Sequence, residues 1–375
     1  MALNVLLIPD AFKDSLSSAE VAQAMKKGIL EVHPNAEIYH ITASDGGEGF
    51  LESVINYLPD AEKVYCDTVD PLGRPHRAAY LIDAARKDAY IELARASGLE
   101  LLKAEERNPM RTSTKGTGIQ IAHAIEQGMN TIYLGIGGSA TNDAATGIAS
   151  ALGFEFLDEI GNTLEPSGQA LTLIDSVKKS NVADDISFYA INDVLNPLYG
   201  PEGAAFTYAK QKGASQTEIE SLEEGLQNIS RVMKNATGKD YAQLPGAGAA
   251  GGTAYGLKAF LGAQFISGVS FLLQLAKFKE LIKSKSIDVI LTGEGCIDSQ
   301  TAYGKLVSGV ALESRPLNVP VVAVCGKLNL NPEEVRSLGL LAADQLFRPD
   351  QPEGYSYTHA SELITERTRE LIKLI

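Results

Sequence analysis

This chain of 375 residues has no tryptophan, only three cysteines and only five histidines. The cysteines form no Cys-x-x-Cys pair and the histidines form no His-Glu-x-x-His motif, which argues against a structural or catalytic zinc site. Widely spaced cysteines without pairs are typical of a reducing compartment. The three are Cys66, Cys296 and Cys325.

Long hydrophobic runs and an excess of positive charge are also missing. No run approaches the length needed to cross a bilayer, and residues 1–5 lack the basic stretch of a signal peptide. Lysine and arginine number 33 against 47 aspartates and glutamates, giving a net charge of -14. Such a chain repels nucleic acid and anionic lipid. We expect a cytoplasmic protein without nucleic-acid or membrane partners, and the sequence makes no prediction of its oligomeric state.

Three catalytic signatures are absent. The chain has no Gly-x-x-x-x-Gly-Lys-Ser/Thr motif, which excludes a P-loop enzyme, and no His-Arg-Asp or Asp-Phe-Gly, which excludes a protein kinase. It also has no Gly-x-Ser-x-Gly elbow, which disfavours a serine hydrolase.

The composition that is present, 45% hydrophobic and 21% charged, is that of a globular protein. Because 375 residues exceed the usual size of one hydrophobic core, we expect two domains. Near both ends of the chain, short apolar runs alternate with helical patterns, which favours a parallel sheet covered by helices. Ser17 and Glu20 form a capping box before one of these helices. We therefore assign residues 1–69 and 278–375 to one α/β domain.

The middle of the chain, residues 70–277, has a different pattern and is predicted to be an inserted second domain. Short strand-like runs at 64–69, 78–82 and 89–93 are separated by turns, which indicates antiparallel pairing. Apolar residues at helical spacing between Ile219 and Met233 predict a surface helix packed on one side.

Glycine-rich segments are the most informative positive feature. Gly135–Asp143 follows an apolar strand, and similar turns are expected at 45–49, 246–252 and 292–295. Turns of this kind expose backbone N–H groups that bind anions. The sequence therefore predicts a phosphorylated ligand shared by several loops.

Charged residues lie beside these glycines. The cations Lys13, Arg74 and Arg111 lie in loops and suit the binding of phosphate or carboxylate groups. Seven acidic residues follow strands or adjoin glycines, more than a phosphoryl transfer requires. They are Asp10, Asp45, Glu48, Asp143, Asp193, Glu294 and Asp298. Of these, Asp45, Glu48 and Asp143 are the ones expected to stabilise helix starts.

Taken together and in order, these segments resemble the bacterial glycerate kinase family. The resemblance spans nearly the whole chain, and its main segments are Pro9–Leu16, Ser44–Gly49, Asp70–Pro75, Arg107–Pro109, Thr112–Gly118, Gly135–Asp143, Asn196–Ala204, Gln211–Ala214, Pro245–Gly252, Thr292–Gly295 and Ile297–Asp298. It implies a two-domain α/β protein, with a Rossmann-like parallel-sheet domain formed by both chain ends and an inserted second domain. It also implies ATP- and Mg²⁺-dependent phosphorylation of D-glycerate, with 2-phosphoglycerate favoured over the 3-isomer.

Our hypothesis for the site assigns each candidate a role. ATP phosphates bind the loop formed by Gly137, Gly138, Ser139, Thr141, Asn142 and Asp143, and glycerate binds Asp10, Lys13, Asp45, Arg74 and Arg111. Asp193 orients the substrate hydroxyl, with Lys13 and Asp298 also assigned to catalysis. Asp298 and Glu294 hold Mg²⁺.

The chain departs from the family's usual pattern at a few positions. Cys296 replaces a common arginine, Ala144 and Ala145 replace common glycines, Asn192 replaces a common cysteine and Lys327 a common serine. These departures bear on substrate preference rather than on the class of reaction.

Two alternatives from other classes remain. One is a protein that binds a nucleotide or sugar acid without turnover. The other is an NAD-dependent hydroxyacid dehydrogenase, since Gly135, Gly137 and Ala140 satisfy Gly-x-Gly-x-x-Ala with Glu155 and Asp158 about twenty residues on.

Overall fold

The computed structural model describes residues 2–12, 15–42, 50–182, 184–298, 301, 306–352 and 354–375. The chain divides into two compact units: unit 1 is residues 1–45 and 268–375, and unit 2 is residues 46–267. The sequence predicted the boundaries at 69/70 and 277/278. The first boundary differs because strand β3 (Glu62–Val69) pairs with β4 (Pro75–Asp83) and thus lies in the sheet of unit 2.

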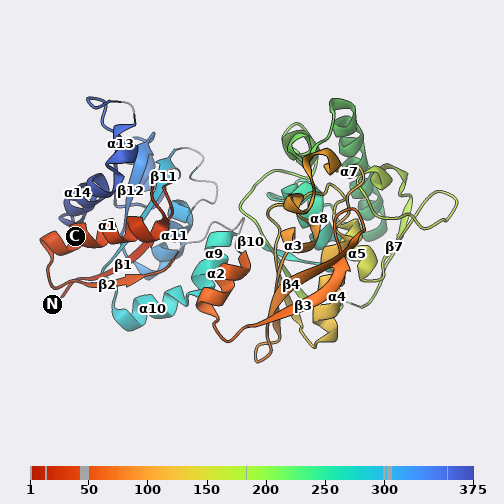
Figure 1. Ribbon diagram of the computed structural model, residues 1–375, viewed down its shortest axis with the longest axis horizontal. Helices are drawn as coiled ribbons and strands as arrows, with labels where there is room; N and C mark the ends of the chain where they lie inside the picture. Colours follow the sequence, from red (N-terminus) through yellow and green to blue (C-terminus); the bar gives the residue numbers. More distant parts are fainter. Residues whose placement is uncertain are drawn as a thin grey trace. The chain divides into compact units, whose positions relative to one another are not determined.

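Unit 1 contains a five-stranded, wholly parallel sheet with the order β13-β12-β11-β1-β2 (Figure 1). The neighbouring strands β1 and β11 come from opposite ends of the chain, with Val5 beside Val289 and Pro9 beside Gly293. The strands are β1 (Asn4–Pro9), β2 (Glu37–His40), β11 (Val289–Ile297), β12 (Val321–Leu328) and β13 (Ala342–Gln345).

Helices cover both faces of this sheet, as the alternation of strands and helices predicted. Helix α1 (Ser18–Val32) packs against α14 (Ala360–Ile372) over one face, and α11 (Leu306–Ser314) packs on β11 and β12 beside α9 (Gly268–Leu275). The capping box of Ser17 and Glu20 is present at the start of α1. Shorter helices are α10 (Phe278–Lys285), α12 (Pro332–Ser337) and α13 (Tyr355–Thr358).

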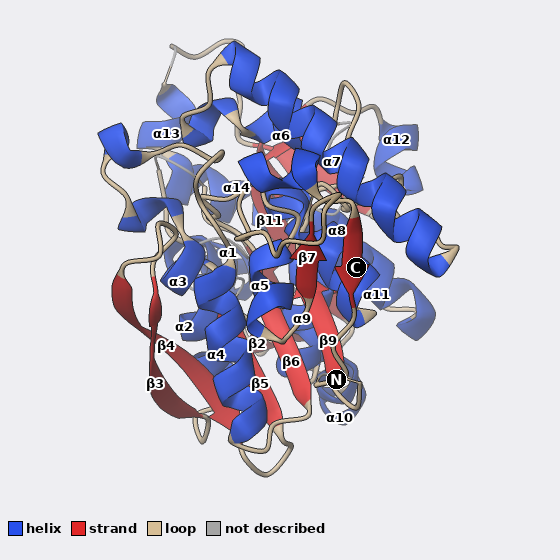
Figure 2. Ribbon diagram, turned by 90° about the vertical axis from the view of Figure 1, so that its right-hand side faces the viewer, coloured by secondary structure: helices blue, strands red, loops and turns tan. Residues whose placement is uncertain are grey.

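Unit 2 contains a six-stranded mixed sheet with the order β10-β9-β6-β5-β4-β3. The pairs β3–β4 and β4–β5 are antiparallel, as predicted, whereas β5, β6, β9 and β10 run parallel. Helices α4 and α5 lie over the face that Figure 2 turns toward the viewer, and with α8 they bury the main core. The remaining bounds are β5 (Asp88–Glu92), β6 (Thr131–Gly135), β9 (Ser187–Ile191), β10 (Gln264–Ile266), α2 (Phe50–Tyr57), α3 (Ala94–Ser97), α4 (Lys115–Glu126), α5 (Thr146–Ala151) and α8 (Ala249–Leu261).

A second core lies between α8 and the long helix α7 (Gln216–Thr237). The predicted apolar stripe of α7 is buried here, with Ile219, Leu222, Leu226, Ile229 and Met233 all in contact with this core. This layer also contains α6 (Ala204–Tyr208) and the hairpin of β7 (Glu155–Leu157) and β8 (Ser176–Lys178).

One predicted turn is wrong. The segment Thr292–Gly295 continues strand β11, with Gly293 opposite Val324 and Glu294 opposite Cys325 of β12. A Cβ atom on Gly293 would lie 2.4 Å from the carbonyl oxygen of Val324. The glycine therefore permits a close approach of backbone to backbone instead of forming a turn.

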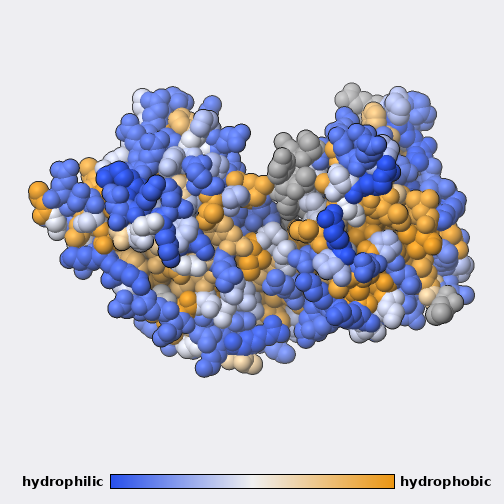
Figure 3. All heavy atoms as spheres, turned by 180° about the vertical axis from the view of Figure 1, so that it is seen from behind, coloured by the Kyte–Doolittle hydropathy of each residue, from blue (hydrophilic) through white to orange (hydrophobic). Residues whose placement is uncertain are grey.

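The surface on the side drawn in Figure 3 is mostly hydrophilic, with hydrophobic residues gathered in patches. Side chains such as Leu312 and Ile160 are exposed, as occurs on ordinary protein surfaces. Among the described helices, none has the length and apolar character required to span a membrane.

Candidate active site

In unit 1, three predicted acidic residues lie on or after the carboxyl ends of the neighbouring strands β1 and β11. Asp10 follows β1 directly, and its backbone N–H donates to the carbonyl oxygen of Gly293 on β11 over 2.9 Å. Glu294 lies within β11 and is 6% exposed, whereas Asp298 follows that strand and is half-buried. Carboxyl ends of parallel strands are the usual location of ligand sites in open α/β sheets.

Thr301 connects the two acids of β11 and its following loop. Its hydroxyl group donates to Glu294 Oε1 over 3.1 Å, and its Oγ1 accepts the backbone N–H of Asp298 over 3.0 Å. Its own backbone N–H donates to the carbonyl oxygen of Asp298. This residue, which the sequence reasoning did not single out, therefore contacts both predicted metal ligands.

The chemistry of these oxygen donors fits Mg²⁺. That ion prefers carboxylate oxygens, keeps several waters and usually takes only one or two carboxylates from the protein, together with substrate phosphates. Glu294 and Asp298 supply two such groups. Among the described residues, no group of three or more His, Cys, Asp or Glu side chains is arranged to hold a metal by itself.

Cys296 contacts one of these acids. Its Sγ lies 3.7 Å from Asp298 Oδ2 and 3.6 Å from the amide nitrogen of Asn329. A thiol therefore adjoins the carboxylate at a position where the resemblance leads us to expect an arginine. Lys327, another departure, lies with its ammonium group 5.8 Å from the ring centre of Phe347.

In unit 2, the predicted phosphate loop connects β6 to α5. Gly138 adopts a left-handed conformation with φ of 70°, which glycine allows without steric cost. Hydrogen bonds from Leu99 N to Gly138 O and from Ala140 N to Ser97 O hold the loop against the end of α3. The backbone N–H groups of Gly137, Gly138 and Ser139 donate to no oxygen in the part of the chain that the structure describes. Unpaired, adjacent backbone N–H groups of this kind are suited to accept an anion.

Asp143 has a structural position at the other end of the loop. It is fully buried, and its Oδ2 accepts the backbone N–H and the hydroxyl of Thr114, each over 2.8 Å, and the backbone N–H of Gly147 over 3.2 Å. Burial raises the pKa of its carboxyl group, and the hydrogen bonds from Thr114 and Gly147 oppose this. One carboxylate thus stabilises the starts of both α4 and α5. This agrees with the expectation that Asp143 stabilises a helix start, and it leaves Asp143 without access to a ligand.

The next two residues explain one departure from the family pattern. Ala144 and Ala145 have φ of 48° and 58°, a left-handed conformation in which an alanine costs about 1–2 kcal/mol. Glycine adopts this conformation freely, so the glycines expected from the resemblance suit the backbone better than the alanines present here.

Thr141 and Asn142, both predicted to bind ATP, are completely buried. The hydroxyl of Thr141 and both polar side-chain atoms of Asn142 have no hydrogen-bond partner among the described residues. Within this loop, only Gly137, Gly138 and a small part of Ser139 are accessible to solvent. The loop therefore divides into an accessible half, up to Ser139, and a buried half.

Lys212 contacts this loop, and the sequence reasoning did not single it out. It lies in the short helix η4 (Lys210–Lys212), is 3% exposed, and donates from Nζ to Ser139 Oγ over 2.8 Å and to Thr141 O over 2.7 Å. Burial lowers its pKa to about 7, and the charge of Asp143 opposes this. The only sequence signal was its place in the matching segment Gln211–Ala214.

The remaining predicted residues of unit 2 lie apart along its chain. Arg74 pairs with Asp70 over 2.5 Å and with Glu106 over 2.6 Å, and its hydrogen bond lowers the pKa of Glu106. Arg111 is exposed; it adds to hydrogen bonds from Ser215 and Asn108 in lowering the pKa of Glu218. Asp193 is exposed two residues after β9.

Three predicted residues, Lys13, Asp45 and Glu48, lie outside the described residues. The others separate by unit: Asp10, Glu294 and Asp298 belong to unit 1, and Arg74, Arg111, Asp193 and the glycine loop belong to unit 2.

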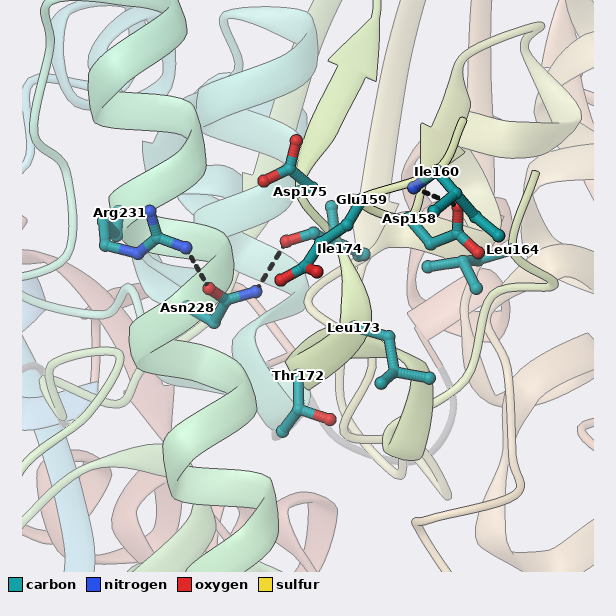
Figure 4. A pocket seen from close by; sticks show the side chains of 10 residues that line it. All are labelled: Asp158, Glu159, Ile160, Leu164, Thr172, Leu173, Ile174, Asp175, Asn228 and Arg231. Atoms are coloured by element: carbon teal, nitrogen blue, oxygen red, sulfur yellow. Dashed lines mark hydrogen bonds between the residues drawn. The ribbon is translucent and has the colours of Figure 1, made fainter. Parts of the chain in front are cut away.

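A pocket of about 410 Å³ lies elsewhere in unit 2, between the β7–β8 hairpin, the short helix η3 (Gln169–Leu173) and α7 (Figure 4). Asn228 bridges it, donating to the carbonyl oxygen of Ile174 and accepting from Arg231. None of the predicted site residues lines this pocket. The lining includes the acids Asp158, Glu159 and Asp175 and the cation Arg231.

Comparisons with known proteins identify the family of this chain. The model of the Glycerate kinase family matches residues 5–375. The chain is 42% identical to a glycerate kinase of Halalkalibacterium halodurans, over 92% of this chain and 90% of that protein. It is 39% identical to glycerate 2-kinase of Escherichia coli, over 87% of this chain and 86% of that protein.

A solved structure shares the fold over the whole chain. It is a crystal structure from Salmonella typhimurium LT2, provisionally named glycerate kinase 2, with a TM-score of 0.77 and 33% identity, covering 100% of this chain and 98% of that one. The mixed α/β fold and the order of motifs along nearly the full length lead to one assignment. This chain belongs to the glycerate kinase family.

Proposed function

We propose that this protein is an ATP-dependent kinase that phosphorylates D-glycerate at its 2-hydroxyl group. The observation that carries the proposal is membership of the glycerate kinase family over nearly the whole chain, with a relative named glycerate 2-kinase among the similar proteins. The acidic edge of unit 1 and the exposed amides of unit 2 supply the two kinds of group that phosphoryl transfer needs, carboxylates and anion-binding donors.

ATP phosphates bind the accessible half of the loop in unit 2. The backbone N–H groups of Gly137, Gly138 and Ser139 are unused within the described chain and point to no internal acceptor. The other half of the loop is completely buried and so cannot contact the nucleotide; it contains Thr141, Asn142 and Asp143. We therefore narrow the direct nucleotide contacts to the first three residues of the predicted set.

Glycerate is bound through its carboxylate by cations, for which Lys13, Arg74 and Arg111 are the candidates, with Asp10 and Asp45 as partners for its hydroxyl groups. Asp193 orients the hydroxyl that is phosphorylated. An exposed carboxylate just after a parallel strand is suited to accept a hydroxyl proton when the substrate is in place.

Glu294 and Asp298 are the residues that would hold Mg²⁺, and Thr301 is hydrogen-bonded to both. When bound, the ion neutralises charge on the phosphates. Thr301 keeps Glu294 oriented by donating a hydrogen bond to its Oε1.

The dehydrogenase alternative has a structural argument against it. In a dinucleotide fold the glycine pattern opens the helix, so that the pyrophosphate meets the helix start. Here α5 begins only at Thr146, six residues after Ala140. Of the two acids that could bind the ribose, Asp158 accepts hydrogen bonds from Ile160 and Asn162, and Glu155 pairs with Lys178. A binder without turnover has no use for carboxylates beside phosphates.

For location we propose the cytoplasm, where ATP is abundant. Each of the three cysteines is a free thiol, in keeping with a reducing compartment.

The test measures ADP release by the purified full-length chain with ATP, Mg²⁺ and D-glycerate. We expect turnover that depends on glycerate, with none when L-lactate or buffer replaces it. A parallel titration with NADH, followed by its fluorescence, is expected to show no binding. Glycerate-independent ATP hydrolysis alone, or binding of NADH with no ADP release, would contradict the proposal.

A further inference from the structure

Lys212, the buried lysine next to the glycine loop, is a charged residue to which the proposed function assigns no role. Lys212 is 3% exposed and has no carboxylate within salt-bridge distance among the described residues. Buried ammonium groups are rare unless they are paired, since removing them from water is costly. Its position therefore calls for a specific physical explanation.

Both hydrogen bonds of the Lys212 ammonium group go to the glycine loop. Nζ donates to Ser139 Oγ over 2.8 Å and to the carbonyl oxygen of Thr141 over 2.7 Å. It thus clamps the loop at the junction between its accessible half and its buried half. The two contacted residues come from a segment more than seventy positions earlier in the chain.

The hydroxyl of Ser139 has one hydrogen, and Lys212 leaves that hydrogen free. Because Oγ accepts from the ammonium group, the O–H bond is available to donate elsewhere, and no acceptor for it exists among the described residues. A hydroxyl that accepts from a cation is also a stronger donor, since hydrogen bonds in a chain polarise one another. Ser139 is 7% exposed and stands next to the free amides of Gly137 and Gly138.

We propose that Lys212 is a positioning residue for the nucleotide, which orients and polarises the Ser139 hydroxyl so that it donates to a phosphate oxygen of ATP. This rests on the proposed function, because it takes the ligand of the loop to be a nucleotide. Lys212 itself does not touch ATP; its charge acts through Ser139 and through the fixed carbonyl of Thr141.

The electrostatics of the site agree with this arrangement. Burial lowers the pKa of Lys212 to about 7, while the charge of Asp143 opposes the effect. A phosphate arriving at Ser139 adds negative charge close to the ammonium group and favours its protonated form. Binding of the anion therefore strengthens the same hydrogen bond that orients the hydroxyl.

The test is a double-mutant cycle on the full-length chain, with the affinity for a non-hydrolysable ATP analogue measured by calorimetry. Ser139→Ala and Lys212→Met are each expected to weaken binding about tenfold. The double variant is expected to bind no more weakly than the single variants, because both changes remove one hydrogen bond. Lys210→Met, an exposed lysine on the same short helix, serves as the control and is expected to leave affinity unchanged.

Two results would overturn the inference. One is an unchanged affinity in Ser139→Ala; the other is a double variant whose loss equals the product of the single losses. Should Lys212→Met not fold, as judged by circular dichroism and its melting temperature, Ser139→Ala decides the question alone. Since the readout is nucleotide affinity, it stays informative even if the wild-type chain shows no turnover with glycerate, the outcome that would refute the proposed function.

Discussion

The glycine clusters of unit 1 and unit 2 look alike in sequence but have different structural roles. In β11, Gly293 lies within a strand and permits close approach to Val324 of β12. In the loop after β6, Gly138 has a left-handed backbone and leaves N–H groups exposed. The difference teaches that a glycine cluster next to a strand need not form a turn, so the prediction of an anion site is kept only for the loop after β6.

The acids of the two units differ in the same way. Asp298 in unit 1 is half-buried at a strand end, whereas Asp143 in unit 2 is fully buried and stabilises two helix starts. We therefore expect changes in unit 1 to affect catalysis and changes at Asp143 to affect folding.

Asp298→Asn is expected to have the largest effect. Loss of one charge-stabilising group should lower kcat about 10²–10³-fold, with an unchanged melting temperature. Steady-state ADP release measures it. Glu362→Gln, an exposed acid on α14, is the matched control and should retain full activity. Near wild-type kcat in Asp298→Asn would remove this residue from the chemistry.

Asp143→Asn should act on stability. The donors at Thr114 and Gly147 all bond to Oδ2, whereas Oδ1 accepts the backbone N–H of Ala145 over 3.3 Å. The amide nitrogen that replaces either oxygen cannot accept, so at least one donor loses its partner and about 1–3 kcal/mol of unfolding free energy is lost. For a unit of this size, each kcal/mol lowers the melting temperature by about 2–4 °C. Differential scanning calorimetry measures the shift. A variant that melts like the wild type but no longer binds ATP would place Asp143 in the site and reverse the contrast.

Arg74→Ala is expected to raise KM for D-glycerate about tenfold while kcat changes little, since a charged contact to the substrate carboxylate is lost. The neighbouring Arg77, which is mostly exposed, offers the control Arg77→Ala. If both variants behave alike, Arg74 serves only its ion pairs with Asp70 and Glu106.

Lys212 predicts a dependence of stability on pH. Its pKa is about 7 in the folded chain against a reference of 10.5, so between these values the unfolded chain binds more protons. Stability must then rise with pH across that window, by at most about 1.4 kcal/mol per pH unit. Denaturant titrations from pH 7 to 10 should show a steeper rise in the wild type than in Lys212→Met. Equal slopes would mean that the lysine keeps an ordinary pKa.

The smallest effect is expected at the pocket on α7. Arg231→Ala removes a hydrogen bond to Asn228 far along the chain from the predicted site residues. Both kinetic constants should stay within about twofold of the wild type, since surface changes rarely exceed 0.5 kcal/mol. A marked rise in KM for ATP or for D-glycerate would show that this pocket takes part in binding.

Local features could be predicted from the sequence. The capping box at Ser17 and the apolar stripe of α7 depend only on residues a few positions apart, and both are present. The antiparallel strands between 62 and 92 were likewise indicated by their short apolar runs and turns.

Features that depend on distant residues could not be predicted. The burial of Lys212 arises from contacts with residues 71 and 73 positions away, and its sequence neighbours include the exposed Lys210 and Gln211. Asp143 was recognised as a possible helix cap, but its bonds to Thr114 require the packing of α4 against α5. Thr301 acquires its role only because Glu294 stays in the strand.

The most direct measurement is a phosphorus NMR spectrum of the product formed from ATP, Mg²⁺ and D-glycerate by the purified chain. We expect a single new phosphomonoester signal, coupled to one proton on the carbon that carries the 2-phosphate. A signal coupled to the two protons of a single CH2 carbon would assign the 3-phosphate instead and contradict the proposed regiochemistry. A spectrum with ATP unchanged, from a folded protein, would contradict the assignment of a glycerate kinase activity itself.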